Sequence, residues 1–110
     1  MIENRIQEIE SKIQDTKNIS EESRRELLSL LATLKSEISR LESTHAEDAR
    51  SISRFADASA HEATRGEKKP LLLAAALQGL TSSVEGLESS HPAISQSVNR
   101  IATALSNMGI

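Results

Sequence analysis

Two short segments combine residue types that could bind a metal ion. Glu42 precedes His45 by three residues, and Glu88 precedes His91 by three residues, so each segment reads E-x-x-H. On a helix this spacing puts the carboxylate and the imidazole one turn apart. Two such pairs, with two further Glu from other helices, form the di-iron site of ferritin-like bundles. The pattern predicts, as one alternative, a metal-binding helical bundle.

The positions of these segments favour a structural role instead. Both lie where helices are expected to end, and Pro92 directly follows His91. Glu42 and Glu88 stand beside the apolar seam and not on it, and no further inward carboxylates are evident. We therefore expect capping and surface roles, and we predict no catalytic, cofactor-binding or metal-ligating residue and no cofactor.

The sequence contains none of the other common catalytic or nucleotide-binding motifs that we considered. The chain has no cysteine, which excludes a thiolate nucleophile and a thiolate zinc site. It contains no G-x-S-x-G turn, no P-loop and no G-x-G-x-x-G. Asp57 and His61, four residues apart, are expected to pair on a helix surface. The protein is predicted not to be an enzyme.

Composition limits the partners. The 110 residues suit one domain, carry a net charge of −3 and include a single aromatic residue, Phe55. This charge and the absence of Trp and Tyr argue against nucleic-acid binding. The longest apolar run, Leu71 to Leu77, is far shorter than the roughly 20 residues that span a bilayer, and the N-terminus does not resemble a signal peptide. We expect a soluble, cytoplasmic protein that binds no membrane.

Apolar residues recur at spacings of three and four in five segments, which is the period of amphipathic helices. With few Gly and Pro, this predicts an all-α, antiparallel bundle of about five helices with coiled-coil-like seams. The single domain, 1–110, divides into an N-terminal hairpin (1–43), an Ala-rich helix and linker (44–69) and a C-terminal hairpin (70–110). The expected seams are Ile2, Ile6, Ile9 and Ile13; Leu27, Leu31, Leu34, Ile38 and Leu41; Ala49, Ile52, Ala56, Ala60 and Ala63; Leu73, Leu77, Leu80, Val84 and Leu87; and Ile94, Val98, Ile101, Leu105 and Met108.

Local signals predict the helix boundaries. Ser20 is a good N-cap for a helix over about 21–43. Thr44 followed by Glu47 has the capping-box pattern and predicts a third helix, although an unbroken helix through this point is the alternative. Gly66 is expected to end the third helix, and Pro70 to open a fourth over about 70–89. A fifth helix begins at Pro92 and ends near Gly109 and Ile110.

Two features distinguish the C-terminal part. Residues 41–45 and 87–91 share the pattern L-E-S-[ST]-H at an offset of 46, which predicts a common corner, with tandem duplication as the alternative. Residues 70–110 contain only Glu85, Glu88 and Arg100 as charged groups, whereas residues 1–44 contain sixteen. Because buried surface is poor in charge, we expect the C-terminal hairpin to be central, covered by the other helices or by another subunit. Gly79 and Gly86 are expected to line a small-residue groove on the fourth helix, and simple tolerance of two glycines is the alternative.

The tail Glu88-Ser89-Ser90-His91-Pro92, then Asn99-Arg100-Ile101 and Leu105-Ser106-Asn107-Met108-Gly109-Ile110, resembles an uncharacterised bacterial family of short helical proteins. Members share an S-H-P corner and a C-terminal L-[AS]-N-[ML]-G-I, and the family is a domain of unknown function. The resemblance covers roughly 80–110. It implies a small helical protein without assigned activity, cofactor or ligand, and it marks His91, Pro92, Asn107 and Gly109 as a corner and a terminus.

These observations predict a non-enzymatic helical protein that self-associates or acts as a scaffold. The chain is expected to form a homodimer or higher homo-oligomer through its C-terminal hairpin, because a short chain buries limited surface by itself. The alternatives are the metal-binding bundle with the two E-x-x-H pairs, and an adaptor that holds a partner helix in the groove near Gly79 and Gly86.

Overall fold

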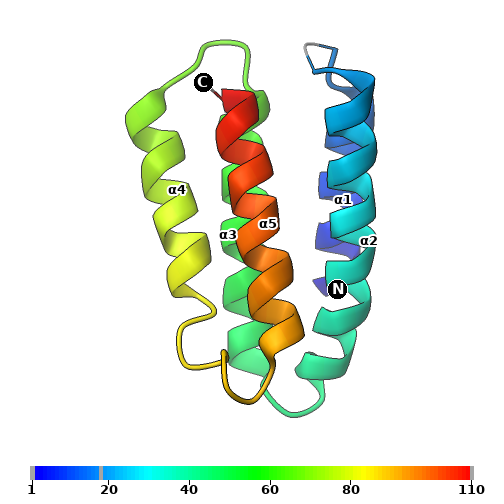
Figure 1. The fold of residues 1–110 in the computed structure, drawn as a ribbon, viewed down its shortest axis with the longest axis vertical. Coiled ribbons are helices and arrows are strands. Elements are labelled where there is room, and N and C mark those ends of the chain that lie inside the picture. The colour runs from blue at the N-terminus through cyan, green and yellow to red at the C-terminus, as the bar shows by residue number, and fades with distance from the viewer. Residues whose placement is uncertain (1, 18, 110) are drawn as a thin grey trace.

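The computed structural model describes residues 2–17 and 19–109, and this part of the chain forms five α-helices and no strand. The helices pack into one bundle of 37 × 24 × 22 Å (Figure 1). The predicted all-α fold is confirmed. The helices are α1 (Ile2–Asp15), α2 (Glu21–Glu42), α3 (Ala46–Thr64), α4 (Pro70–Ser82) and α5 (Pro92–Gly109).

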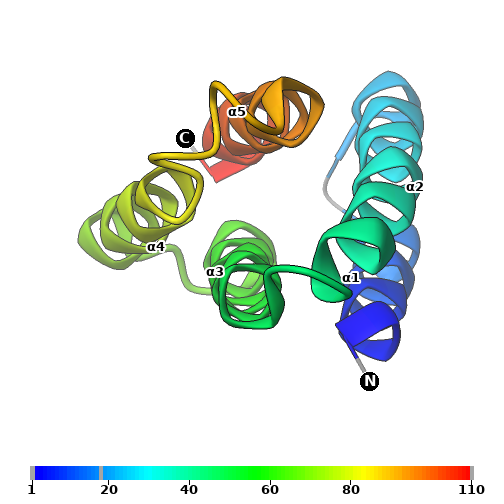
Figure 2. The ribbon, with the colours of Figure 1, turned by 90° about the horizontal axis from the view of Figure 1, so that it is seen from below.

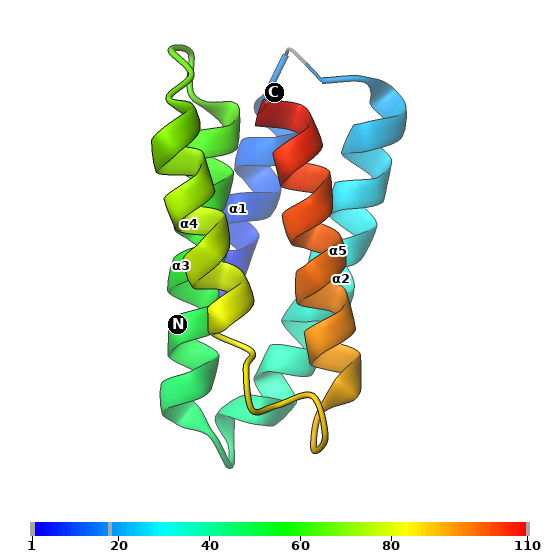
Figure 3. The same ribbon diagram turned by 60° about the vertical axis from the view of Figure 1, so that its left-hand side comes forward.

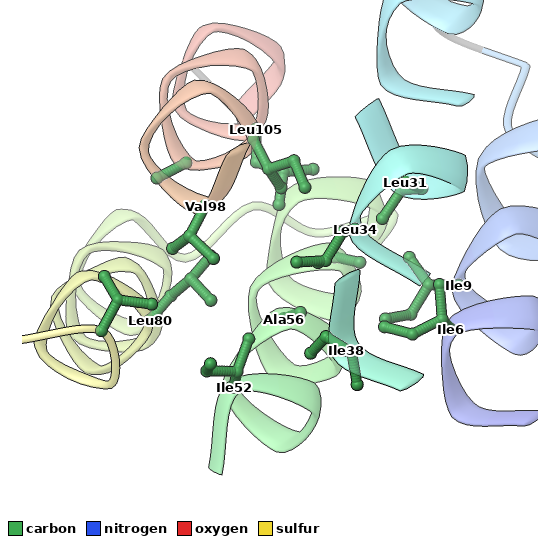
Figure 4. Packing of buried hydrophobic residues seen from close by; sticks show 14 of the residues in the cluster. Ile6, Ile9, Leu31, Leu34, Ile38, Ile52, Ala56, Leu80, Val98 and Leu105 are labelled. Atoms are coloured by element: carbon green, nitrogen blue, oxygen red, sulfur yellow. The ribbon is translucent and has the colours of Figure 1, made fainter. Parts of the chain in front are cut away.

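The predicted seams form the core. Every described seam residue is buried except Leu77 and Met108, which are partly buried and pack against the core. Figure 4 shows Leu80 of α4 facing Val98 of α5, while Ile6 and Ile9 of α1 lie near Ile38 of α2. The side chain of Ile2 and all of Ile110, both named above, lie outside the described residues.

The central helix is α3. It packs against each of the other four helices, with α1 and α2 on one side and α4 and α5 on the other (Figure 2). Four of its five seam residues are alanines, and such small side chains let helix axes approach closely. The predicted central position of the C-terminal hairpin is therefore wrong for α4, which within the described residues packs only against α3 and α5. The alternative, that another subunit covers this helix, stays a prediction. The helix next to it, α5, is buried along its seam.

The charges of the N-terminal part connect helices. Asp57 of α3 binds Arg5 at 3.2 Å and Lys12 at 3.9 Å, both from α1. The expected pairing of Asp57 with His61 is thus replaced, because two α1 cations reach this carboxylate. Arg24 of α2 donates hydrogen bonds of 2.6–2.8 Å to the carbonyls of residues 13, 14 and 16, which satisfies the C-terminal end of α1.

The first residues of α2 and α4 agree with their local signals, whereas both ends of α3 differ from the prediction. Ser20 caps α2 by accepting from the Ser23 amide at 3.1 Å, and Pro70 opens α4. The predicted Thr44 cap is wrong, because His45 occupies the N-cap position of α3 and makes no side-chain cap. The break there also excludes an unbroken helix. The C-cap of α3 is Arg65 and not Gly66.

The fourth helix is shorter than the expected 70–89. It ends at Ser82, and turns continue to residue 90. The Ser83 hydroxyl donates to the Leu80 carbonyl at 2.6 Å, and Gly86 adopts a left-handed φ of 88°, which only glycine enters without cost. Val84 and Leu87 are buried although they lie beyond the end of α4. The helical spacing of apolar residues therefore continues past the last helical residue.

Candidate functional site

The two L-E-S-[ST]-H segments come together in space. The connection from α2 to α3 and the connection from α4 to α5 lie at the same end of the bundle (Figures 1 and 3). There the rings of His45 and His91 meet edge to face, with centroids 5.1 Å apart and an interplanar angle of 77°. Residues that are 46 positions apart in the sequence thus form one cluster, which we call the histidine corner pair.

The two corners are built alike around these rings. The His45 amide donates to the Leu41 carbonyl, and the His91 amide donates to the Leu87 carbonyl, each at 2.7 Å. In both corners the preceding hydroxyl contacts the ring: Thr44 Oγ1 lies 2.8 Å from His45 Nδ1, and Ser90 Oγ lies 3.0 Å from His91 Nδ1. The His carbonyls accept from the following helix, from the amides of Ala49 and Ser95 respectively.

These contacts explain why the pattern repeats. Leucine anchors the corner in the core, the backbone turn closes on its carbonyl, and the hydroxyl orients the imidazole. The prediction of a common corner therefore agrees with the geometry. The Ser or Thr hydroxyl contacts Nδ1 of the adjacent imidazole. The backbone carbonyl of the histidine accepts the first hydrogen bond of the next helix.

The carboxylates of the two E-x-x-H pairs are not arranged as ligands. Glu42 is exposed, and Glu88 Oε2 accepts a hydrogen bond of 2.7 Å from the Gly86 amide. Among the residues that the structure describes, no three His, Asp or Glu side chains gather in a way that could hold a metal ion. A di-iron centre of the ferritin-like kind thus lacks its carboxylate ligands here.

A hollow of about 300 Å³ borders the histidine corner pair between the end of α2 and the start of α5. Glu37 and Arg40 line it from α2, and residues 90–94 line it from the second corner. Glu37 Oε1 is buried and accepts no hydrogen bond from any described group. The hollow is therefore lined by a carboxylate, a guanidinium and an imidazole, those of Glu37, Arg40 and His91.

The outer face of α4 is the second notable surface. Leu71 is 86% exposed and Leu72 is 48% exposed, although both are leucines in a regular helix. Ala75, Gln78 and Ser82 continue the exposed stripe at helical spacing, and Gln78 Nε2 donates to Ser82 Oγ at 3.1 Å. Because Pro70–Ser82 contains no charged residue, this face offers a partner apolar and neutral polar groups only.

Gly79 and Gly86 do not share a groove. An added Cβ at Gly79 would lie 2.2 Å from Cε1 of Phe55, so the glycine accommodates the aromatic ring of α3. Gly86 lies in the turn beyond α4, with open space around its Cα. The predicted close contact is present at Gly79, whereas Gly86 serves the backbone turn. The space that was expected to receive a partner helix is filled by Phe55.

Sequence reasoning missed both the meeting of the two imidazoles and the exposure of Leu71. The repeated L-E-S-[ST]-H pattern was the available signal for the first. The signal for the second was a helix with leucines on all its sides, which cannot bury every one of them in a small bundle. No described helix has the length and hydropathy needed to cross a membrane.

Comparison with known proteins adds a family and no activity. No curated protein and no solved structure matches the chain. Residues 27–110 match the model of a domain of unknown function, DUF4404. The match includes the Ala-rich helix α3 and most of α2, well beyond the tail that carries the resemblance in sequence, and it leaves out α1. As it spans more than half of the chain, the protein belongs to the DUF4404 family.

Proposed function

We propose that this protein is a non-enzymatic scaffold that self-associates through the outer face of α4. The observation that carries the proposal is the exposure of Leu71 and Leu72 on a helix without charge. A helix that is apolar on all sides is typical of a buried position. Within the described part of the single chain, however, α4 lies at the edge of the bundle and packs only against α3 and α5.

The chemistry of this face suits a second copy of the chain. In a two-fold dimer each residue near the axis meets itself or its close neighbours, so a charged face would repel its copy. The outer face of α4 carries no charge and pairs without that penalty. Burial of two leucines from each chain would supply about 1.5–3 kcal/mol per fully buried side chain.

The size of the interface requires more than α4. A stable interface buries about 800 Å² per partner. A helix of 13 residues is only about 20 Å long, so its outer face alone falls short of that area. Phe55 of α3, 40% exposed, lies against Gly79 on the side of α4 that also carries Leu72, and we place it in the same interface.

Size exclusion with light scattering tests the proposal. We expect a dimer or larger assembly at about 100 μM, and we expect the Leu71→Glu, Leu72→Glu variant to be monomeric because two carboxylates cannot be buried unpaired. Ala32→Glu on the exposed side of α2 is the matched control and keeps the wild-type mass. A wild-type chain that stays monomeric at this concentration contradicts the proposal.

A further inference from the structure

We propose that the histidine corner pair is a binding site for one divalent transition-metal ion of the Zn²⁺ or Ni²⁺ type, held by the Nε2 atoms of His45 and His91. The inference is independent of self-association through α4. It also differs from the di-iron alternative, because it uses the imidazoles and not the carboxylates of the E-x-x-H pairs.

The spacing of the rings carries the first step. Zinc binds histidine nitrogen at about 2.0–2.1 Å, and two imidazoles on one tetrahedral ion then have ring centres about 5 Å apart. The observed separation between His45 and His91 is 5.1 Å, with the planes at 77°. The His45 side chain is exposed, so an ion from solvent can reach its ring.

The hydroxyl partners supply the second step. Thr44 Oγ1 and Ser90 Oγ each lie within hydrogen-bond distance of Nδ1 of the adjacent ring, at 2.8 and 3.0 Å. A hydroxyl can accept from Nδ1–H, which leaves the lone pair on Nε2. Histidines that bind metals are usually held in this way, with the second ring nitrogen donating to an outer partner.

The hollow beside His91 contains one charged side chain of each sign, Glu37 and Arg40. The buried Glu37 Oε1, which accepts no hydrogen bond within the described chain, lines the same hollow as the His91 ring. Its negative charge offsets the positive charge of Arg40, so the hollow is close to neutral for an ion bound at His91. Since the described residues bring no third ligand to the pair, water completes the coordination of the ion. Nitrogen ligands without thiolates suit Zn²⁺ and Ni²⁺.

Calorimetric titration of the metal-free, full-length chain with ZnCl₂ and with NiCl₂ tests the site. We expect one ion per chain and an affinity that falls at least tenfold in His45→Gln and in His91→Gln. The chain provides a matched control in its third histidine, because His61 is exposed on α3 and His61→Gln should bind as the wild type does. Far-UV circular dichroism confirms that each variant is folded.

A second pair of variants examines the geometry. Thr44→Val and Ser90→Ala together remove both Nδ1 partners and keep both imidazoles, and loss of such outer partners typically weakens metal binding by about 10–100-fold. Light scattering with and without zinc shows whether the ion stays within one chain, as the 5.1 Å ring separation implies. Absence of binding, binding unaffected by His45→Gln and His91→Gln, or a zinc-dependent dimer would overturn the proposal.

Discussion

Helices α3 and α4 occupy positions opposite to those that their hydropathy predicts, because the more apolar helix is expected at the centre of a bundle. The more apolar of the two, α4, lies at the edge with Leu71 and Leu72 exposed. The Ala-rich α3, which carries charges at both ends, packs against all four other helices. The two helices lie side by side (Figure 2). The ring of Phe55 on α3 packs against Gly79 on α4.

The difference shows that side-chain size decides which helix is central. A helix surrounded by four others must have small residues on several sides, since axes 8–10 Å apart leave little room between them. On α3, Ala56 and Ala60 lie on one side, and the fully buried Ser53 and Ser59 extend the small residues to both flanks of that side. The leucines of α4 bury more area each but need space, so this helix can use only one side within the chain.

The largest expected effect is a difference in stability loss between truncations on the buried side and on the exposed side of α4. Leu80→Ala removes a fully buried side chain, and we expect a loss of about 2–5 kcal/mol in the free energy of unfolding. Leu71→Ala, the same change at an exposed position, should cost less than about 0.5 kcal/mol in the monomer. Urea denaturation at a concentration that keeps the chain monomeric measures both, and equal losses would mean that α4 does not lie as described.

The next effect tests whether α3 depends on small residues. Ala60→Leu adds volume to a position with no exposed surface and should destabilise the fold by about 1–3 kcal/mol. Ala75→Leu, the same change on the outer face of α4, is expected to leave unfolding unchanged and to strengthen self-association. If Ala60→Leu were neutral in urea denaturation, the explanation by side-chain size would be wrong.

The smallest effect concerns the contact between the two helices. Gly79→Ala gains about 1 kcal/mol of helix propensity but displaces the Phe55 ring, so we expect little net change. In a Phe55→Ala background the ring is absent, and the same substitution should stabilise the protein by about 1 kcal/mol. A double-mutant cycle from chemical denaturation measures the coupling. Additive effects would show that Phe55 does not occupy the space beside Gly79.

Much of the fold was predictable because its signals are local. The spacing of Leu27, Leu31 and Leu34 predicts one apolar side of a helix wherever that helix packs. Ser20 and Pro70 act within one turn of their own positions, and both were placed correctly. The end of α4 was missed because Val84 and Leu87 keep the helical spacing while Gly86 adopts a left-handed conformation.

The candidate sites were less accessible to sequence reasoning. The repeated L-E-S-[ST]-H pattern indicated two similar corners, but their meeting depends on how α2 and α5 pack beside each other. The low charge of residues 70–110 predicted a central C-terminal hairpin, but α5 buries only one side and exposes Gln96, Asn99 and Thr103. The same signal failed for α4, because low charge is equally typical of a surface that awaits a partner.

By itself, the sequence determined that the chain is helical, which side of each helix is apolar, and that two corners share one construction. Only the tertiary structure decided that α3 is central, that α4 presents leucines outward, and that His45 meets His91. The physical reason is the distance along the chain over which each interaction acts. Helical period and capping depend on residues within a turn or two, whereas the choice of neighbours depends on the volumes of side chains far apart in the chain.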